Sequence, residues 1–425
     1  MKFALACYGT RGDVEPSVAL GRELVRRGHE VRMAVPPDLV DFAAAAGLPA
    51  VAYGPDLQEM LDAHRALWSR FSRNFWKVHQ LIALWQEAWA PRIRCWEEMS
   101  ETLKSLADGA DLLITGLVFE EPAANIAEYY NIPLAALHYF PIRTNGSLIP
   151  SLPRLLTRTA MAANEWVTWR ITKKVEDAQR RELGLPKATD PSPQRVTKRG
   201  ALEVQAYDEL SFPGLADEWA QFGCRRPFVG ALTVGLPTTA DDDVLSWIAT
   251  GTPPIFFGFG STPVQSPSET LEMIRVVCAE LGERALVCAG ASDFSDVSAH
   301  EHVKVVDAVN YAAIFPACRA VVHHGGAGTT ATALRAGVPQ LILSTDLDQM
   351  MWGIRIKRLN VGTAHRLSKV TSTSLLTDLR RVLEAHYITR AREIATQMTT
   401  SAESAQTTAD LVEEFARSSR VAGPQ

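Results

Sequence analysis

Residues 320–343 read AVVHHGGAGTTATALRAGVPQLIL, and this stretch decides the fold class. The apolar run 320–323 predicts a buried strand, 329–336 predicts a helix, and 340–343 predicts a second strand. A helix between two strands implies that the strands are parallel, with a right-handed crossover between them. The stretch therefore predicts an open, doubly wound parallel α/β sheet.

The same alternation runs along the whole chain and divides it in two. Strands are expected at 2–8, 30–35, 49–53, 111–115, 133–138 and 204–207, and again at 254–258, 285–288 and 303–306. Between the two sets, Gly, Pro, Thr and Asp interrupt the periodicity. We therefore expect two Rossmann-like domains that face a cleft. Their expected bounds are 1–225 and 244–400, with a linker at 226–243 and a helix end and tail at 401–425.

Three helical segments complete this prediction. Asp13 is placed as a possible N-cap of a helix that runs from about residue 15 to 27. An aromatic-rich helical stretch is expected at 56–107. The last helices are expected at 372–385 and 389–416, with a frayed tail from 418.

Composition restricts the classes of function. The chain has 425 residues, 47% of them hydrophobic and 21% charged, so each domain can bury a core. A net charge of −5 argues against a dedicated nucleic-acid binder. The six cysteines form no CxxC pair, and no apolar run approaches the length of a membrane span. We expect a cytoplasmic protein, with peripheral contact to the inner face of a membrane left open.

The glycine-rich run His323–Thr330 carries the strongest chemical signal. Its glycines allow the backbone to approach a ligand closely, and the free N–H groups of a helix start favour a diphosphate. His324 and Thr329 would add side-chain donors. The alternative is a plain glycine turn. The GxGxxG dinucleotide fingerprint and the P-loop are both absent from the sequence, which argues against a nicotinamide enzyme or a P-loop NTPase.

Two further loops follow predicted strands, at the carboxyl ends where doubly wound sheets bind ligands. Gly258–Thr262 contains Ser261, whose hydroxyl could donate to a phosphate, although a simple turn is as good a reading. Gly9–Pro16 contains Asp13, which is expected to face the cleft, where it could face a ligand. It could also be a helix N-cap worth about 1 kcal/mol, and the two interpretations are compatible.

Together these elements resemble the two-Rossmann-domain (GT-B) glycosyltransferases. They are most similar to bacterial enzymes that glycosylate glycopeptide antibiotics and cell-envelope glycopeptidolipids. The resemblance is carried by YGTRGDVEPSVALGRELVRRGHEVRMAVPP at 8–37, by FGFGS at 257–261, and by VVDAVNYAAIFPACRAVVHHGGAGTTATALRAGVPQLIL at 305–343 with DLDQ at 346–349.

The resemblance implies a role for each matching residue. These are Asp13 as catalytic base with Thr10 beside it; Ser261, His324, Gly326, Gly328 and Thr329 as the diphosphate cradle; Val306 and Val309 beside the nucleotide base; and Asp348 with Gln349 on the hydroxyls of the transferred sugar. Thr332 stands where plant relatives hold the ribose with a glutamate, so a dTDP-sugar is as plausible as a UDP-sugar. Met350 replaces the usual proline, and Val306 replaces a tryptophan. The C-terminal segment is expected to pack back on the first domain.

The resemblance also implies a reaction: inverting transfer of a hexose or 6-deoxyhexose to a hydroxyl of an amphipathic acceptor, such as a glycopeptidolipid, without cofactor or metal. Trp68 and Trp76 could line the acceptor groove, or they could pack internally. Two alternatives stay open, a sugar-nucleotide epimerase of similar build and a non-catalytic sugar-nucleotide-binding protein. An epimerase would act on its substrate without an acceptor.

Overall fold

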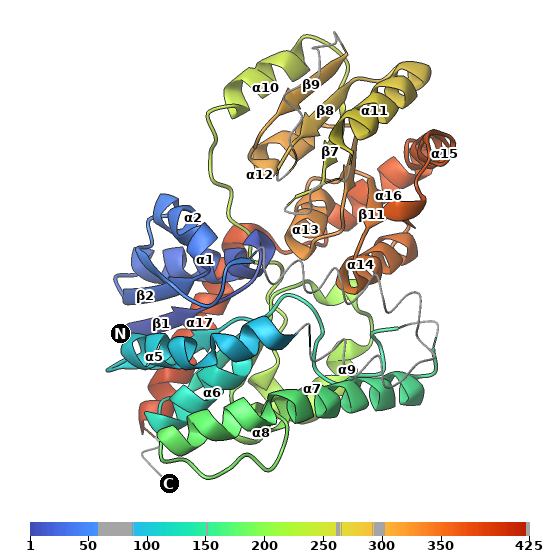
Figure 1. Cartoon of the computed structure of the whole chain (residues 1–425). Coiled ribbons are helices and arrows are strands. Elements are labelled where there is room, and N and C mark those ends of the chain that lie inside the picture. The colour runs from blue at the N-terminus through green and yellow to red at the C-terminus, as the bar shows by residue number, and fades with distance from the viewer. Residues whose placement is uncertain are drawn as a thin grey trace. The chain divides into compact units, whose positions relative to one another are not determined.

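The structure, a computed structural model, describes residues 1–57, 87, 89–149, 152–260, 264, 266–290, 292 and 302–421 (Figure 1). It separates into two compact units, one made of Met1–Leu232 with Ser401–Gln425 and the other of Thr233–Thr400. Each unit contains a six-stranded sheet in which every strand pair is parallel. The predicted class, two doubly wound parallel sheets in tandem, is confirmed.

Unit 1 is built on a sheet with the strand order β3-β2-β1-β4-β5-β6. The strands are β1 (Lys2–Ala6), β2 (Glu30–Val35), β3 (Ala50–Ala52), β4 (Leu112–Thr115), β5 (Leu134–His138) and β6 (Leu202–Gln205). β1 lies in the middle because it pairs with both β2 and β4, with Ala4 opposite Arg32 and Leu113. The residues that follow β1, β4 and β5 therefore meet at one edge of the sheet.

Helices cover both faces of this sheet. They are α1 (Arg11–Arg26), α2 (Val40–Ala45), α5 (Trp96–Ala107), α6 (Glu120–Tyr129), α7 (Arg154–Glu182), α8 (Ser192–Lys198), α9 (Leu215–Trp219) and α17 (Ser401–Val421), with short 3₁₀ turns at Pro37–Leu39, Glu209–Ser211 and Ala220–Arg225. Trp96, Met99 and Leu103 of α5 are fully or almost fully buried against the sheet. α17 packs on α1, where Arg27 Nη1 lies 2.6 Å from Asp410 Oδ1 and 3.0 Å from Glu413 Oε1.

Unit 2 repeats the architecture with the strand order β12-β11-β10-β7-β8-β9. Its strands are β7 (Ile255–Gly258), β8 (Ala285–Cys288), β9 (Val303–Val306), β10 (Ala320–His323), β11 (Gln340–Ser344) and β12 (Gly362–Arg366). Its helices are α10 (Asp241–Ala249), α11 (Pro267–Leu281), α12 (Tyr311–Ile314), α13 (Ala327–Arg335), α14 (Leu347–Arg358), α15 (Ser372–Val382) and α16 (Ala385–Ala395), with 3₁₀ turns at Phe315–Ala317 and Leu367–Lys369. α11 and α15 pack on one face of the sheet, and α10, α12 and α13 lie against the other.

Several expected boundaries differ from the structure. The helix expected at 389–416 is two helices, α16 and α17, separated by a turn in which Thr396, Thr399 and Thr400 disfavour helix. α17 extends to Val421, so the tail expected from 418 is helical for four more residues. β12 was not predicted. Of the aromatic-rich stretch 56–107, residues 58–86 and 88 lie outside the described part. Among the described helices, none combines the length and apolar character needed to cross a bilayer.

Candidate active site

The first candidate site lies in unit 1, where β1 passes into α1. Thr10 is the N-cap of α1, and Asp13 occupies the third helical position. Asp13 Oδ2 accepts hydrogen bonds from the backbone N–H of Thr10 (2.5 Å) and from its hydroxyl (2.8 Å). The prediction that Asp13 is the N-cap is therefore wrong by three positions, because Thr10 caps the helix and Asp13 completes the capping box.

Gly9 makes room for this carboxylate. Its φ of +129° lies in the region that favours glycine, and a Cβ atom at position 9 would stand 2.3 Å from Asp13 Oδ2. The carboxylate thus occupies the space that any other residue at position 9 would need. The loop orients Asp13 because Gly9 leaves room for the carboxylate and Thr10 supplies two hydrogen-bond donors.

A third donor comes from Tyr139, which was not among the residues singled out from the sequence. Its hydroxyl donates a hydrogen bond to the second carboxylate oxygen, Asp13 Oδ1. Tyr139 directly follows β5, and Asp13 follows β1, so both stand at the carboxyl edge of the sheet. The signal that could have found it is a polar aromatic residue placed immediately after a buried strand.

A buried ionic network anchors the loop that carries Tyr139. Arg143 Nη1 donates to Glu120 Oε2 (2.9 Å) and its Nε donates to Glu203 Oε2 (2.7 Å). His138 Nε2 lies 3.5 Å from Glu120 Oε1. Burial alone would raise the pKa of Glu120, but Arg143 and His138 outweigh it and lower that pKa to about 2. Residues on both sides of Tyr139 are therefore fixed to the core of unit 1.

In unit 2, the two histidines after β10 have different environments. His323 is fully buried; its Nδ1 accepts from the Gly325 N–H (3.1 Å), and its Nε2 lies 2.9 Å from Gln340 Oε1. Nδ1 is thus an acceptor, which places the ring proton on Nε2. Burial, assisted by His324, lowers the pKa of His323 to about 3. His323 is a neutral structural residue that holds the start of the glycine loop.

His324 lies among glycines. A Cβ atom at Gly260 would stand 2.6 Å from its Cε1, and one at Gly326 would stand 2.7 Å from its Nε2. Burial lowers the pKa of His324 to about 4, with a smaller opposite effect from the Gly258 carbonyl. At neutral pH the ring is therefore uncharged, with one donor and one acceptor nitrogen.

The glycine loop leads directly into the N-terminus of α13. Gly326 is the N-cap, with extended backbone (φ −62°, ψ 144°), and, being glycine, it contributes no side chain to cap the first N–H groups of the helix. Gly328 and Thr329 are half-buried in the first turn. Uncapped N–H groups and the helix dipole favour an anion at this point. The hydroxyl of Thr332 donates to the Gly328 carbonyl (2.8 Å), so its own hydrogen bond stays within the helix.

Val306 is the last residue of β9, and Val309 lies in the loop that follows. Val309 is buried in the cluster that contains Phe256 and Phe315, and Val306 packs against its edge. Beside Val309, the backbone N–H of Asn310 donates to Asp241 Oδ1 (2.9 Å). The loop after β9 is therefore tied to the start of α10.

The pair Asp348 and Gln349 stands in the first turn of α14, and the two residues differ in exposure. Asp348 is exposed, whereas Gln349 is buried. Gln349 Oε1 accepts from the N–H (2.8 Å) and the hydroxyl (3.0 Å) of Thr345, and its Nε2 donates to Asp346 Oδ2 (3.2 Å). The amide of Gln349 thus completes a capping box with Asp346, the N-cap.

The remaining residues selected from the sequence, Ser261, Trp68 and Trp76, lie outside the described residues. The structure thus brings Thr10 and Asp13 together in unit 1, and His324, Gly326, Gly328 and Thr329 together around the start of α13 in unit 2. Gly325 connects the latter group to α14, because a Cβ there would stand 3.2 Å from Gln349 Cβ.

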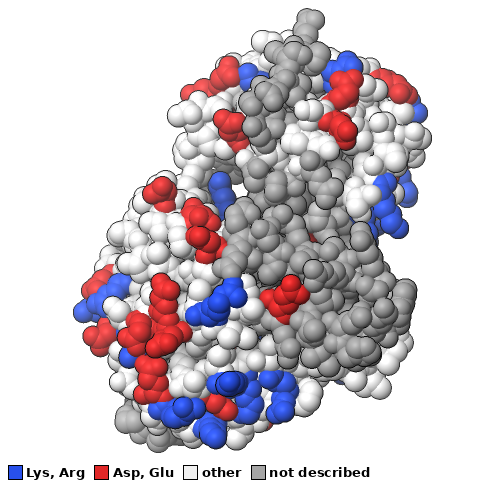
Figure 2. Space-filling model, viewed as in Figure 1, with Lys and Arg blue, Asp and Glu red and all other residues white. Residues whose placement is uncertain are grey.

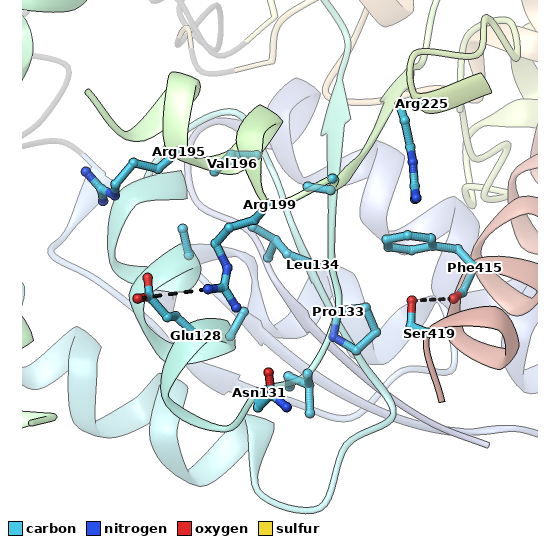
Figure 3. A pocket seen from close by; sticks show the side chains of 15 residues that line it. Glu128, Asn131, Pro133, Leu134, Arg195, Val196, Arg199, Arg225, Phe415 and Ser419 are labelled. Carbon is cyan, nitrogen blue, oxygen red and sulfur yellow. Dashed lines mark hydrogen bonds and ion pairs between the residues drawn. The ribbon is translucent and has the colours of Figure 1, made fainter. Parts of the chain in front are cut away.

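A separate pocket of about 390 Å³ opens at the other edge of the first sheet (Figure 3). It is lined by residues that precede β5 and β6, such as Asn131 and Gly200, together with side chains from α17. Arg225 lies over the ring of Phe415, 5.0 Å from its centroid, and Arg199 pairs with Glu128 at 3.9 Å. Because all strands are parallel, this pocket is on the edge opposite to Asp13 and Tyr139.

Within the described ranges, His, Cys, Asp and Glu side chains form no group of three that could hold a metal ion. The acidic run 241–243 begins α10. Asp241 accepts from the N–H and the hydroxyl of Thr238 and from the N–H of Asn310. Burial opposes these hydrogen bonds, but they lower the pKa of Asp241 on balance. Asp241 thus joins the segment before α10 to the loop after β9 by hydrogen bonds.

Two family models match the chain. Residues 3–94 match the glycosyltransferase family 28 N-terminal domain, and residues 277–415 match the C-terminal domain of the erythromycin biosynthesis protein CIII-like family. An uncharacterized glycosyltransferase of Mycobacterium leprae is 57% identical, covering 98% of this chain and 97% of its own. One from Mycobacterium tuberculosis is 56% identical, covering 99% and 100%. A sterol 3-beta-glucosyltransferase of Arabidopsis thaliana is 27% identical, covering 93% of this chain and 65% of its own.

Solved structures share the fold along the whole length. The glycosyltransferase of kitacinnamycin has a TM-score of 0.69 and 17% identity, and covers 97% of this chain and 98% of its own. The glycosyltransferase VinC in complex with dTDP has a TM-score of 0.68 and 20% identity, covering 99% and 100%. At this level of identity, the structural likeness shows the fold alone.

Proposed function

Since the chain belongs to the GT-B glycosyltransferases, with a family 28 N-terminal and an erythromycin CIII-like C-terminal domain, we propose that it is an inverting hexosyltransferase. It transfers a hexose or 6-deoxyhexose from a nucleoside diphosphate sugar to a hydroxyl of an amphipathic acceptor. The observation that carries this proposal is the Asp13 carboxylate, oriented by Thr10 and Tyr139 at the carboxyl edge of the first sheet.

Asp13 acts as the general base. As the acceptor oxygen forms its bond to the anomeric carbon, the hydroxyl proton passes to the Asp13 carboxylate. The bond between the anomeric carbon and the diphosphate oxygen breaks on the opposite side, so the configuration inverts and the nucleoside diphosphate leaves. Because a carboxylate is a weak base for an alcohol, the proton moves late, when bond formation has already made the hydroxyl acidic. Thr10 and Tyr139 keep the carboxylate in position during this step.

The nucleotide sugar binds to unit 2. The N–H groups at the start of α13, the glycines Gly326 and Gly328, and the hydroxyl of Thr329 support a diphosphate site, and the uncharged ring of His324 lies beside Gly326. Ser261 is proposed beside them. Val306 and Val309 are proposed to flank the base, and Asp348 to contact the sugar. The structures of two glycosyltransferases, VinC and the Streptomyces sp. SF2575 enzyme SsfS6, contain dTDP. This supports a nucleoside diphosphate of this kind as the ligand of unit 2. Thr332 supplies no carboxylate for the ribose, so UDP and dTDP both stay candidates.

The acceptor is proposed to be amphipathic, such as a lipopeptide, a glycopeptidolipid or a sterol. The plant relative at 27% identity is, by its name, a sterol glucosyltransferase, which supports both a hexose and a largely apolar acceptor with one hydroxyl. Trp68 and Trp76 are proposed on the acceptor side. We also propose that the reaction needs no metal ion. The helix start and His324 would stabilise the charge of the diphosphate, which is the role of a divalent cation in other enzymes.

One assay tests these proposals together. Purified full chain is incubated with dTDP-, UDP- and GDP-hexoses and with a lipopeptide, a sterol or a simple phenol, and products are identified by mass spectrometry. We expect glycosylated acceptor and an equal amount of nucleoside diphosphate, with a rate unchanged by EDTA. Isomerised nucleotide sugar without acceptor would instead identify an epimerase. Nucleotide binding in a thermal-shift assay, without turnover of any pair, would identify a binding protein.

A further inference from the structure

The first half of α7 exposes large apolar side chains that a surface helix usually buries. Among residues 154–171, only Thr157 is buried. The side that faces the body of unit 1 is held by polar contacts: Glu165 Oε1 accepts from the Thr144 hydroxyl (2.8 Å), and Arg158 Nε donates to Glu218 Oε1 (2.7 Å). A surface helix normally turns its apolar side inward. Here the inward side also holds the half-buried Met161, Trp169 and Ile171, but it is tied to unit 1 by polar contacts and it leaves other large apolar side chains outside.

The outward side of the same segment is apolar. Leu155 is 72% exposed, Leu156 57%, Trp166 55% and Val167 36%. At 3.6 residues per turn these four side chains fall within a sector of about 120° on the helix. With Leu152 just before the helix, they make up five of the twelve large apolar side chains exposed among the described residues. Isolated exposed leucines need no explanation, but a contiguous apolar patch marks an interaction surface.

The second half of α7 continues this face with positive charge. Arg170, Lys174 and Arg181 lie in the same helical sector. No Asp or Glu among the described residues lies within ion-pair distance of these three cations. Three acidic residues lie on this half: Asp177 pairs with Lys173 at 3.1 Å, Glu176 pairs with Arg195, and Glu182 lies 3.8 Å from Lys104. Figure 2 shows Lys and Arg gathered along this edge of unit 1, where Figure 1 places α7 and α8.

We propose that this α7 outer face (Leu155, Leu156, Trp166, Val167, Arg170, Lys174 and Arg181) docks on an anionic lipid surface. A bilayer offers an apolar interior, in which the leucines can be buried, directly beside phosphate groups that attract the cations. Trp166 suits the boundary between them, and Arg170 lies over its ring at 5.7 Å from the centroid. A second copy that paired through the same face would place these cations against one another. The proposal stands on α7 alone and does not depend on the proposed reaction.

The test is partition of the full chain into vesicles of phosphatidylglycerol and phosphatidylcholine, compared with pure phosphatidylcholine, by co-sedimentation. We expect binding to the anionic vesicles that weakens at high salt. The triple variant Leu155→Ser/Leu156→Ser/Trp166→Ser should bind at least tenfold more weakly. Arg170→Gln/Lys174→Gln should lose the preference for anionic lipid. Leu245→Ser/Val276→Ser, which changes exposed apolar residues of α10 and α11, is the matched control and should bind as the wild type does.

Melting temperatures and turnover of a water-soluble acceptor are measured for each variant. An unchanged melting temperature and turnover in the triple variant would assign its loss of binding to the α7 outer face itself. Absence of vesicle binding by the wild type at low salt, or equal binding by the triple variant, overturns the proposal. A concentration-dependent dimer that the triple variant abolishes, without any lipid binding, would assign the face to a second copy instead.

Discussion

The hydroxyl of Tyr139 donates a hydrogen bond to Oδ1 of Asp13 across 126 positions of sequence. The other carboxylate oxygen accepts two hydrogen bonds from Thr10. The proposed base is therefore fixed both by its own helix start and by the loop after β5. Asp13 therefore has a proposed chemical role, as proton acceptor, and a structural role, as part of the helix cap. The first three predictions use substitutions that affect these two roles differently.

Asp13→Asn should lower kcat at least a hundredfold, because the amide cannot accept the proton of the acceptor hydroxyl. The side chain can still accept from the Thr10 N–H and thus keep the cap, so the melting temperature should change little. Asp13→Ala removes both functions and should also lose about 1 kcal/mol of stability. Steady-state kinetics with thermal unfolding checks both variants. Full activity in Asp13→Asn would exclude Asp13 as the base.

Gly9→Ala should abolish most activity, because its Cβ would stand 2.3 Å from Asp13 Oδ2 and displace the carboxylate. The control is Gly28→Ala. Gly28 also has positive φ (+84°), but nothing lies within 4 Å of a Cβ built there. Both variants carry the backbone strain of a positive φ. We expect a loss of kcat only in Gly9→Ala, with a loss of stability that exceeds that of Gly28→Ala by about 1 kcal/mol because the cap is also displaced. Equal losses of kcat in the two variants would contradict the prediction.

Tyr139→Phe should lower kcat on the order of tenfold, the effect expected for one hydrogen bond to a charged group. The ring stays in place, so the KM for the nucleotide sugar and the melting temperature should change little. Because Tyr139 positions Asp13, combining Tyr139→Phe with Asp13→Asn should add almost nothing to the loss caused by Asp13→Asn alone. Additive losses of the two variants would show that Tyr139 acts independently of Asp13.

Much of the fold could be predicted because buried parallel strands are short apolar runs with helices between them. β12 was missed because Gly362–Arg366 reads GTAHR, and only its first two residues are buried. An edge strand needs no continuous apolar run. The break between α16 and α17 lacks glycine and proline, so the helical pattern seemed continuous through Thr396–Thr400 in the sequence.

The candidate site also contains residues that could be predicted from the sequence and residues that could not. Asp13, Thr10 and the glycine loop are local motifs, so their residues could be named from the sequence. Tyr139 reaches Asp13 only because β5 lies two strands from β1, a relationship that no short motif contains. His323 and His324 are adjacent and look equivalent in sequence. The contact with Gln340, seventeen residues away, makes His323 structural.

His323 and His324 make stability depend on pH. In the unfolded chain a histidine gains its proton near pH 6.5, whereas burial lowers the pKa of His323 to about 3 and that of His324 to about 4 in the folded state. Their contribution is therefore fully present above about pH 6.5 and is lost as the pH falls toward 4. Burial raises the pKa of Glu165, which acts in the opposite direction.

The test measures the melting temperatures of the wild type and of His323→Gln at pH 7.5 and at pH 5.0. The change between the two pH values is then compared between the two proteins. We expect the wild type to lose more on acidification than the variant does. An equal loss in both would show that His323 takes up its proton alike in the folded and unfolded states.

The adjacent residues Asp348 and Gln349 should separate donor recognition from helix capping. Gln349→Ala removes the amide that caps α14, so it should lower stability by about 1 kcal/mol. Gln349→Glu preserves a side-chain acceptor at the capping-box position and should recover most of that loss. Asp348 is exposed, so Asp348→Asn should leave the melting temperature nearly unchanged and raise the KM for the nucleotide sugar several-fold. Kinetics at saturating acceptor, with thermal unfolding, measures both effects. A raised KM with unchanged melting temperature in Gln349→Ala would show that its amide leaves the cap to bind the sugar, as the family resemblance implies.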